Sequence, residues 1–292
     1  MKRTLPYIVL ALIAFVIGCQ EAQFPIDSLP QGSVNTRIGD TVYVLQNPVW
    51  TGFNHPQGVI VGNEPFIYVA DTDNDRIVML DLIGRVIGYS QKIKRPVALT
   101  QDKRLQLIVC AQFDTLLPGK QAPTTFGAVY RLDLVSTGHD ISSIKPRRIF
   151  FEPSDSTRRY AGVASLYNNQ YYVCRNGPKN ELTRIDRDLA ILQFSKDDEL
   201  LSPVTTSFSP DGTGLLSLST MSAIATTSAP GNRSVEFVFC QTGDHALYKV
   251  QWIQYRVEGQ TANFISKFYP SLDGSIDFLR LKHFSQPAGV TF

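Results

Sequence analysis

Three cysteines recur at one position of a repeating pattern, and they are the first residues whose chemistry has to be judged. Cys110, Cys174 and Cys240 each stand where an earlier copy of the pattern has Ala70. Thiolates could bind a metal, but the sequence has no C-x-x-C motif and no histidine that recurs beside these cysteines. A repeat position that holds alanine in one copy and cysteine in the others is typical of a site that needs a small, buried, apolar side chain. We therefore expect core packing, with a disulfide between neighbouring copies as the alternative.

Histidine and carboxylate side chains are the second group of candidate functional residues. The four histidines do not share a position in the pattern, which argues against a metal held by equivalent imidazoles: His55, His139, His245 and His283. Asp71, Asn176 and Asp244 each follow the second strand-like run of a copy, so they could gather at one face of the fold. The alternative is that such residues hydrogen-bond the backbone of their own turns.

We predict no catalytic residue and no metal ligand. The candidate binding-face loops carry six residues: Asp71, Asn74, Arg76, Asn176, Asp244 and His245. The sequence has no G-x-S-x-G motif, no phosphate-binding P-loop and no dinucleotide fingerprint. We expect residues 158–159 (RR) and 197–199 (DDE) to lie in solvated turns, and residues 112–126 to form an inserted loop that is either passive or a binding loop.

The elements that must position these residues repeat with a fixed internal spacing. Twelve residues separate Gly58 from Ala70, and the same spacing recurs at 98–110 and 162–174, with a longer version at 223–240. A third run follows each pair, and we align its four copies at 76–81, 128–133, 181–186 and 246–251. The runs are short and rich in Val, Ile and Tyr, which is typical of β-strands.

Repeated four-stranded units predict an all-β fold, a β-propeller whose blades surround an axis. We expect the propeller over residues 39–292, with blades at about 53–90, 91–152, 158–203 and 213–270. Residues 284–292 match residues 53–61 at Phe, Pro, Gly and Val, and they predict the start of a further blade. Residues 41–46 are typical of a strand that closes such a ring. We expect either that blades are missing from this chain or that it is a natural open arc.

The first copy resembles a known family. Residues 56–59 (PQGV), 68–71 (YVAD) and 74–77 (NDRI) are similar to the NHL repeat, whose propellers have six blades. Only residues 55–88 carry the resemblance strongly. It implies a six-bladed ring whose C-terminal part is incomplete in this chain.

The N-terminus is typical of a secretion signal. Lys2 and Arg3 precede an uncharged apolar run at 7–17, which is too short to span a bilayer. Residues 16–19 (VIGC) resemble the lipobox of bacterial lipoproteins. This resemblance implies a signal peptide at 1–18, a lipid (diacylglycerol and palmitate) on Cys19, and a tether at 19–38. Gln20 favours the outer membrane if the cell is Gram-negative; an ordinary cleaved signal is the alternative.

Composition narrows the function classes. The chain has 28 Lys and Arg against 26 Asp and Glu, and Lys2 and Arg3 lie in the signal, so the mature charge is near zero and a nucleic-acid partner is disfavoured. We expect an envelope lipoprotein whose propeller is a non-catalytic binding or scaffolding module for a protein, peptide or glycan, with no cofactor besides the lipid. The alternative is a metal-dependent propeller enzyme of the lactonase-like or lyase-like kind.

Overall fold

The computed structural model describes residues 49–181, 183–204, 220–226, 233–242, 249–259, 261–266 and 287–290. The chain divides into two units, Met1–Val49 and Trp50–Phe292, and the second contains the fold described below. The lipobox with Cys19, the tether, Asp244, His245 and His283 lie outside the described residues. Among the described residues, no helix has the length and hydrophobicity needed to cross a membrane.

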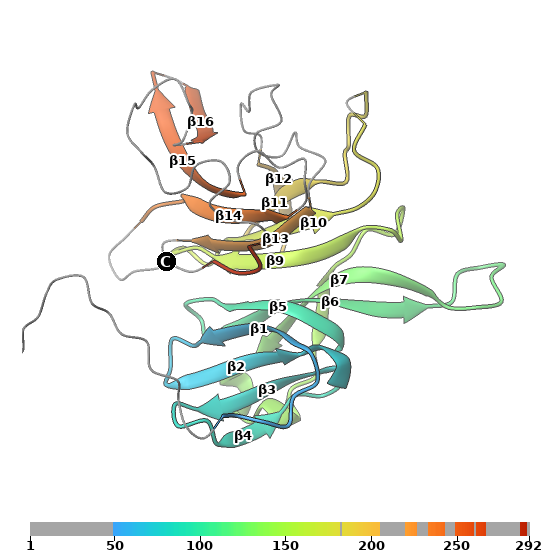
Figure 1. Cartoon of the computed structure of the whole chain (residues 1–292), viewed down its shortest axis with the longest axis vertical. Helices are drawn as coiled ribbons and strands as arrows, with labels where there is room; N and C mark the ends of the chain where they lie inside the picture. The colour runs from blue at the N-terminus through green and yellow to red at the C-terminus, as the bar shows by residue number, and fades with distance from the viewer. Residues whose placement is uncertain are drawn as a thin grey trace, which may run out of the picture. The chain divides into compact units, whose positions relative to one another are not determined.

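The described residues form four sheets, each a four-stranded antiparallel meander (Figure 1). The first sheet contains β1 (Pro56–Val61), β2 (Phe66–Asp71), β3 (Arg76–Asp81) and β4 (Val86–Tyr89). The second contains β5 (Lys94–Gln101), β6 (Gln106–Thr115), β7 (Thr124–Asp133) and β8 (Arg147–Phe150). The third contains β9 (Arg159–Ser165), β10 (Tyr171–Asn176), β11 (Ala190–Phe194) and β12 (Leu200–Pro203). The fourth contains β13 (Thr220–Thr226), β14 (Phe237–Thr242), β15 (Val250–Glu258) and β16 (Thr261–Ser266).

The prediction of an all-β fold built from four-stranded propeller blades is confirmed by this topology. Three short 3-10 helices, η2 (Thr72–Asn74), η3 (Val135–Thr137) and η4 (Ile141–Ser143), interrupt the connections. The number of blades in a complete ring stays a prediction.

Cross-strand pairing explains the fixed spacing in the sequence. Gly58 pairs with Ala70 across β1 and β2, and the corresponding partners in the other sheets are Ala98 with Cys110, Gly162 with Cys174, and Ala223 with Cys240. The first strands β1, β5, β9 and β13 are neighbours in this order (Figure 1). A Cβ at Gly58 would meet Leu99 Cδ2 at 2.9 Å, so small residues are required where neighbouring first strands approach one another.

The third strands depart from the expected alignment in two sheets. Val129 pairs with Cys110 and Ile77 with Ala70, as the alignment of 76–81 with 128–133 requires. In the third sheet, however, Cys174 pairs with Ile191, and in the fourth Cys240 pairs with Val250. The alignments at 181–186 and 246–251 are therefore wrong. The residues just before β11 have a strand-like sequence, but they form a loop. Within this loop, the Asp186 carboxylate accepts hydrogen bonds from Arg158 and Arg175, two buried arginines of the third sheet.

Apolar side chains of adjacent sheets pack against one another and form the core. Tyr68, Ile77 and Met79 of the first sheet pack with Leu107 and Val109 of the second. Similar clusters join the second sheet to the third and the third to the fourth. In the described part of the chain, Cys110, Cys174 and Cys240 are buried free thiols; the first two lie within these clusters, and Cys240 packs with Val238 and Val250 of the fourth sheet. Burial of this apolar area is the main stabilising contribution to such an array.

Hydroxyl groups link the ends of the first strands. Ser165 Oγ, at the end of β9, donates to the carbonyl oxygen of Gln101 at the end of β5 over 2.7 Å. Thr226 Oγ1, at the end of β13, donates to the carbonyl oxygen of Ser165. We call these two bonds the hydroxyl latch. Each one satisfies a carbonyl of the preceding blade, so it fixes the position of one blade against the next.

Two segments expected in solvated turns contain buried charges. Arg158 is buried and donates to Asp188 and Glu152, at 2.8 Å and 2.5 Å. Asp198 lies in a turn but accepts from Arg131, whose side chain is only 4% exposed. The expectation was wrong at these two residues because a charge cluster in the sequence does not reveal partners that are distant in the chain, such as Asp188 for Arg158 and Arg131 for Asp198. Buried ions persist only where such partners satisfy them.

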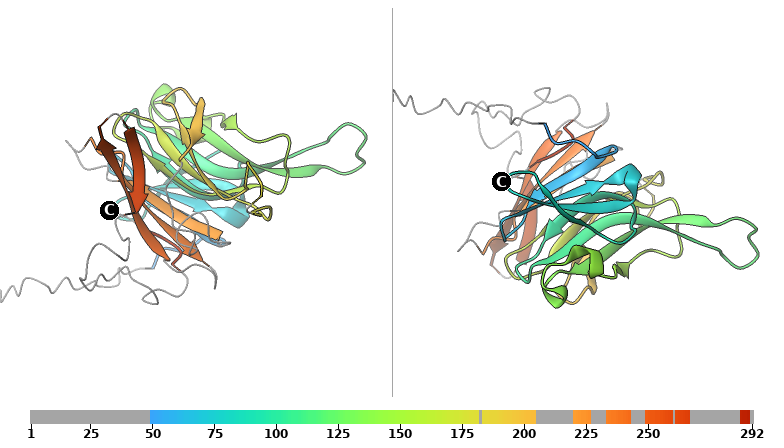
Figure 2. Two further views of the ribbon diagram at one scale, coloured as in Figure 1. Left: turned by 90° about the horizontal axis from the view of Figure 1, so that it is seen from above. Right: turned by 90° about the horizontal axis from the view of Figure 1, so that it is seen from below.

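The expected inserted loop at 112–126 is mostly regular structure. β6 and β7 continue their pairing outward as far as Thr115 and Thr124. Figure 2 shows the resulting hairpin, drawn in green, projecting from the sheets in both views. The rings of Phe113 and Phe126 stack, Phe151 meets both of them edge-on, and the Arg148 guanidinium lies 3.8 Å from the Phe113 ring centroid.

Candidate functional site

A cavity of about 670 Å³ opens where the first strands begin and the second strands end. We call it the cup. Its polar lining comes from several blades, because the strand beginnings meet around the axis. The described lining residues are Pro56, Gln57, Arg95, Val97, Ala111, Gln112, Arg159, Tyr160, Ala161, Asn176, Thr220, Met221, Ser222, Thr242 and Ala288.

A second cavity, of about 710 Å³, extends along the first strands. The two cavities share five lining residues and are therefore adjacent: Gln57, Val97, Ala161, Ser222 and Ala288. The second cavity reaches the opposite ends of the first strands, where Thr100, Ser165 and Thr226 line it.

Two arginines give the cup its charge. Arg95 lies at a left-handed backbone position with φ of 44°, and its Nη1 donates to Asp73 Oδ1 over 2.7 Å. Arg159 Nη1 donates to the carbonyl oxygens of Ser156 and Arg158, at 2.6 Å and 2.8 Å. These bonds engage one nitrogen of each guanidinium. The fork geometry of arginine leaves further N–H groups that can donate to a carboxylate.

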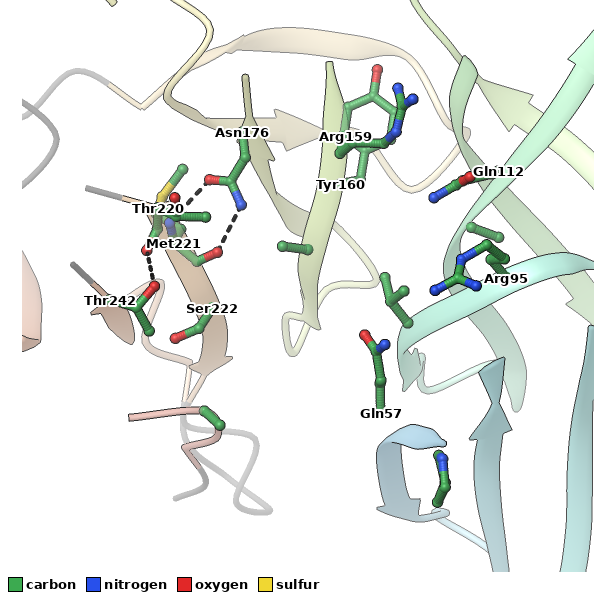
Figure 3. A pocket seen from close by; sticks show the side chains of 15 residues that line it. Gln57, Arg95, Gln112, Arg159, Tyr160, Asn176, Thr220, Met221, Ser222 and Thr242 are labelled. Carbon is green, nitrogen blue, oxygen red and sulfur yellow. Dashed lines mark hydrogen bonds between the residues drawn. The ribbon is translucent and has the colours of Figure 1, made fainter. Parts of the chain in front are cut away.

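Amide and hydroxyl groups complete the lining. Figure 3 shows Gln112, Arg95 and Gln57 on one side of the cup and Thr220, Ser222 and Thr242 on the other. Thr242 Oγ1 donates to the carbonyl oxygen of Thr220 at 3.4 Å, so this hydroxyl still has its lone pairs available. The cup therefore offers donors and acceptors on two of its sides.

Asn176 lines the cup but is already bound to the neighbouring blade. Its Nδ2 donates to the carbonyl oxygen of Met221 over 2.7 Å, and its Oδ1 accepts from the Met221 N–H over 3.0 Å (Figure 3). These bonds join the end of β10 to the start of β13. The two hydrogen bonds between the Asn176 side chain and the Met221 backbone resemble those between neighbouring strands, and they fix this part of the cup wall.

A buried ionic network lies behind Arg159. Glu152 Oε1 accepts from both Arg158 and Arg175, and Glu152 Oε2 accepts from the Tyr160 hydroxyl. Burial and the nearby Glu152 charge raise the pKa of Tyr160 well above its usual range. Asp186 and Asp188 complete the network on the other side of the two arginines. The network holds the start of β9, and with it Arg159, in place.

The other described candidates from the sequence form a separate cluster. Asp71 is fully buried, and its carboxylate accepts from Asn54 N–H, Asn74 Nδ2 and Arg76 Nε at 2.7–2.8 Å. Arg76 also lies over the Tyr89 ring, 4.1 Å from its centroid. Asp71, Asn74 and Arg76 are brought together, but they are not among the residues that line the cup. Asp244 and His245 lie outside the described residues.

Sequence reasoning missed Arg95, Gln112 and Arg159. Arg95 and Arg159 lie near the starts of first strands, and Gln112 lies within β6, just past Ala111. One signal was available, because Arg95 and Arg159 each stand three positions before the repeated small residue, Ala98 or Gly162, and residues at one register lie at the same end of the axis. In the described part of the chain, the cup lining contains no Asp, Glu, His or Cys, and no group of three such residues is placed to hold a metal.

No protein-family model and no curated protein sequence matches the chain. Solved structures with a similar fold include a gluconolactonase from Xanthomonas campestris, 14% identical over 68% of this chain, with a TM-score of 0.43. A streptogramin B lyase is 15% identical over 81% of this chain, with a TM-score of 0.44. The match spans 58% of the length of each of these two proteins.

Regucalcin from Agrobacterium tumefaciens, a calcium-binding protein, is 12% identical over 74% of this chain and 75% of its own, with a TM-score of 0.38. At such values the likeness concerns the blade architecture alone. The expectation of a non-catalytic module and its lactonase-like or lyase-like alternative both stay predictions.

Proposed function

We propose that the chain is a ligand-binding propeller whose cup takes a small organic anion, one carboxylate with neighbouring hydroxyl groups. The observation that carries this proposal is that Arg95 and Arg159 both line a cup whose described lining has no acidic side chain. A guanidinium binds a carboxylate through two parallel N–H bonds, which gives both affinity and orientation. Gln57, Gln112 and Ser222 supply donors and acceptors for the hydroxyl groups.

A pair of probes that differ by one carboxylate tests this proposal. Isothermal titration with D-glucuronate should give binding, whereas D-glucose should bind far more weakly. The Arg159→Gln variant should weaken glucuronate binding roughly 10- to 100-fold, as expected for one charge-assisted hydrogen bond. Arg184→Gln removes an arginine outside the cup, which pairs with Glu181 at 3.7 Å, and is the matched control. Equal binding of both sugars, or equal effects of both variants, contradicts the proposal.

The lipid anchor is the second part of the proposal. The VIGC motif at 16–19 supports acylation of Cys19 and a place in a bacterial envelope, with the propeller on a tether. Intact-protein mass spectrometry of the detergent-extracted chain should show a mature N-terminus at Cys19 carrying acyl chains. The Cys19→Ser variant should remain uncleaved and unacylated. A mature protein of the same unmodified mass from both genes contradicts this part.

Catalysis in the same cup is the second candidate. Guanidinium groups that bind a carboxylate can also stabilise the oxyanion that develops when an ester or lactone is hydrolysed. Hydrolysis of D-glucono-1,5-lactone, followed as acid release, would support this candidate if Arg159→Gln slowed it and Arg184→Gln did not. The assay should be run with and without Ca²⁺ and Zn²⁺, because the alternative from the sequence is a metal-dependent enzyme. An unchanged background rate under all conditions rejects it.

A further inference from the structure

The turn between β3 and β4 holds exposed apolar side chains on a rigid support. Leu82 is 54% exposed and Ile83 70% exposed, and Ile87 at the adjoining strand is also more than half exposed. Asp81 fixes the turn, because its carboxylate accepts from the N–H groups of Ile83 and Arg85 and pairs with the Arg85 side chain. Exposed aliphatic side chains gathered on a fixed turn are characteristic of a contact surface. We call residues 82–87 the apolar turn.

Trp50 lies directly against this turn. A Cβ built on Gly84 would fall 2.0 Å from the Trp50 indole nitrogen, so the ring rests on the glycine backbone. Gly84 has a φ of +88°. Both observations explain why glycine is needed here. Trp50 is also the point at which the chain enters the propeller unit. The segment that leads to Cys19 therefore joins the fold beside the apolar turn.

The apolar turn and the cup lie at opposite ends of the first sheet. Pro56, which lines the cup, pairs with Asp71, and Asp71 pairs with Arg76 at the start of β3. Asp81 at the other end of β3 pairs with Phe66, and the apolar turn follows it directly. Antiparallel pairing thus separates the two features by the full length of the strands.

We propose that the apolar turn is a membrane-contact surface, which seats the propeller on a lipid bilayer with the cup facing away. This inference rests on the proposed acylation of Cys19. About 30 residues separate Cys19 from Trp50. A chain of that length reaches about 100 Å at most, so an acylated Cys19 holds the whole propeller unit near the bilayer at a high effective concentration, at which even a weak apolar contact is populated.

The chemistry of the turn fits a lipid interface. Leucine and isoleucine side chains partition into the acyl region of a bilayer. Trp50 supports the turn from the protein side, because its indole nitrogen is buried and its ring packs against the apolar cluster of the first sheet. Arg85, whose side chain is 77% exposed, pairs with Asp81 through its Nε and has terminal N–H groups that can reach lipid phosphates. The occupant that this combination favours is the surface of a lipid bilayer.

Two cysteine reporters test the inference in the full-length lipoprotein. Ile83→Cys places a thiol on the turn, and Ile185→Cys places one at another exposed isoleucine, in the loop before β11. The cysteines native to the described part of the chain are buried, so the environment-sensitive dye NBD will label the new thiol. Each labelled protein is reconstituted into vesicles of phosphatidylethanolamine and phosphatidylglycerol. A thermal melt checks that both variants fold as the parent protein does.

We expect a blue shift and a several-fold rise in NBD emission at position 83 on reconstitution, and no change at position 185. Quenching by brominated lipids should follow the same order. If Cys19 is acylated and the dye at position 83 stays as aqueous as that at 185, the inference is overturned while the anchor stands. If Cys19 carries no acyl chain, both the proposed lipid anchor and the membrane-contact surface are contradicted. A shift at position 83 that develops without vesicles and grows with protein concentration identifies a second copy of the chain and also overturns the inference.

Discussion

Cys240 Sγ lies 3.8 Å from the carbonyl oxygen of Gly289, and Cys110 Sγ lies 3.7 Å from the carbonyl oxygen of Gly162. The two contacts are equivalent, because each cysteine is the partner of the repeated small residue in its own sheet. Gly162 belongs to β9, the first strand of the next sheet. Residues 287–290 therefore lie against the fourth sheet as β9 lies against the second. Ser222 Oγ supports this position by donating to the Pro287 carbonyl oxygen over 2.6 Å.

The thiols should be protected from alkylation in the folded protein. Burial raises the pKa of Cys240 to about 11, and it raises those of Cys110 and Cys174 further. An unfolded thiol has a pKa of about 8.5, so at pH 8 only the unfolded chain presents much thiolate. Iodoacetamide labelling with peptide mapping should find all three unreactive at pH 8, and Cys240 the first to react as the pH approaches 11. Fast labelling of Cys110 before Cys240 would contradict this order.

Asp71 should be essential for the stability of the first blade. The Asp71→Ala substitution removes a buried acceptor of three hydrogen bonds and leaves Arg76 without its partner. We expect a loss of about 3 kcal/mol in the free energy of unfolding, measured by urea denaturation. Asp81→Ala in the exposed β3–β4 turn is the control and should cost clearly less. Equal losses would show that the burial of Asp71 has no energetic consequence.

The hydroxyl latch should contribute to the contact between blades. Ser165→Ala and Thr226→Val each leave a carbonyl of the preceding blade without its donor. Each should lower the free energy of unfolding by about 1 kcal/mol. Ser136→Ala removes a hydroxyl that bonds only within its own turn, to the Asp133 carbonyl oxygen, and serves as the control. A latch variant as stable as the parent would show that water replaces the lost bond.

Asp198 should make the protein sensitive to acid. Burial by itself would raise the pKa of Asp198, but the hydrogen bonds and charge of Arg131 outweigh it and hold this pKa below its usual value. A depressed pKa stabilises the fold above the unfolded value of about 3.9, and this contribution is lost as the pH falls below it. Asp198→Asn should cost about 2–3 kcal/mol at pH 7 and flatten the fall in stability between about pH 5 and 3. Parallel stability curves for the two proteins, measured by urea denaturation at each pH, would contradict this assignment.

The sequence by itself determined the blades. Gly58, Ala98, Gly162 and Ala223 could be recognised because each must be small where first strands meet, and the partners of these residues recur at fixed distances because strand pairing is local. The same logic failed for β11 and β15. The loops before these two strands vary in length, so the spacing does not locate them. The sequence at 181–186 resembles a strand, but its Asp186 carboxylate accepts hydrogen bonds from the buried Arg158 and Arg175.

Only the tertiary structure decided the site. Arg95 and Arg159 belong to different blades, 64 positions apart, and they share the cup because neighbouring first strands begin at the same end of the axis. Arg158 is adjacent to Arg159 in sequence, yet it is buried in an ionic network while Arg159 lines a cavity. Arg158 is buried because Glu152, Asp186 and Asp188 surround its guanidinium. Two of these partners lie about 30 positions further along the chain, so no local pattern in the sequence encodes the difference between the two neighbours.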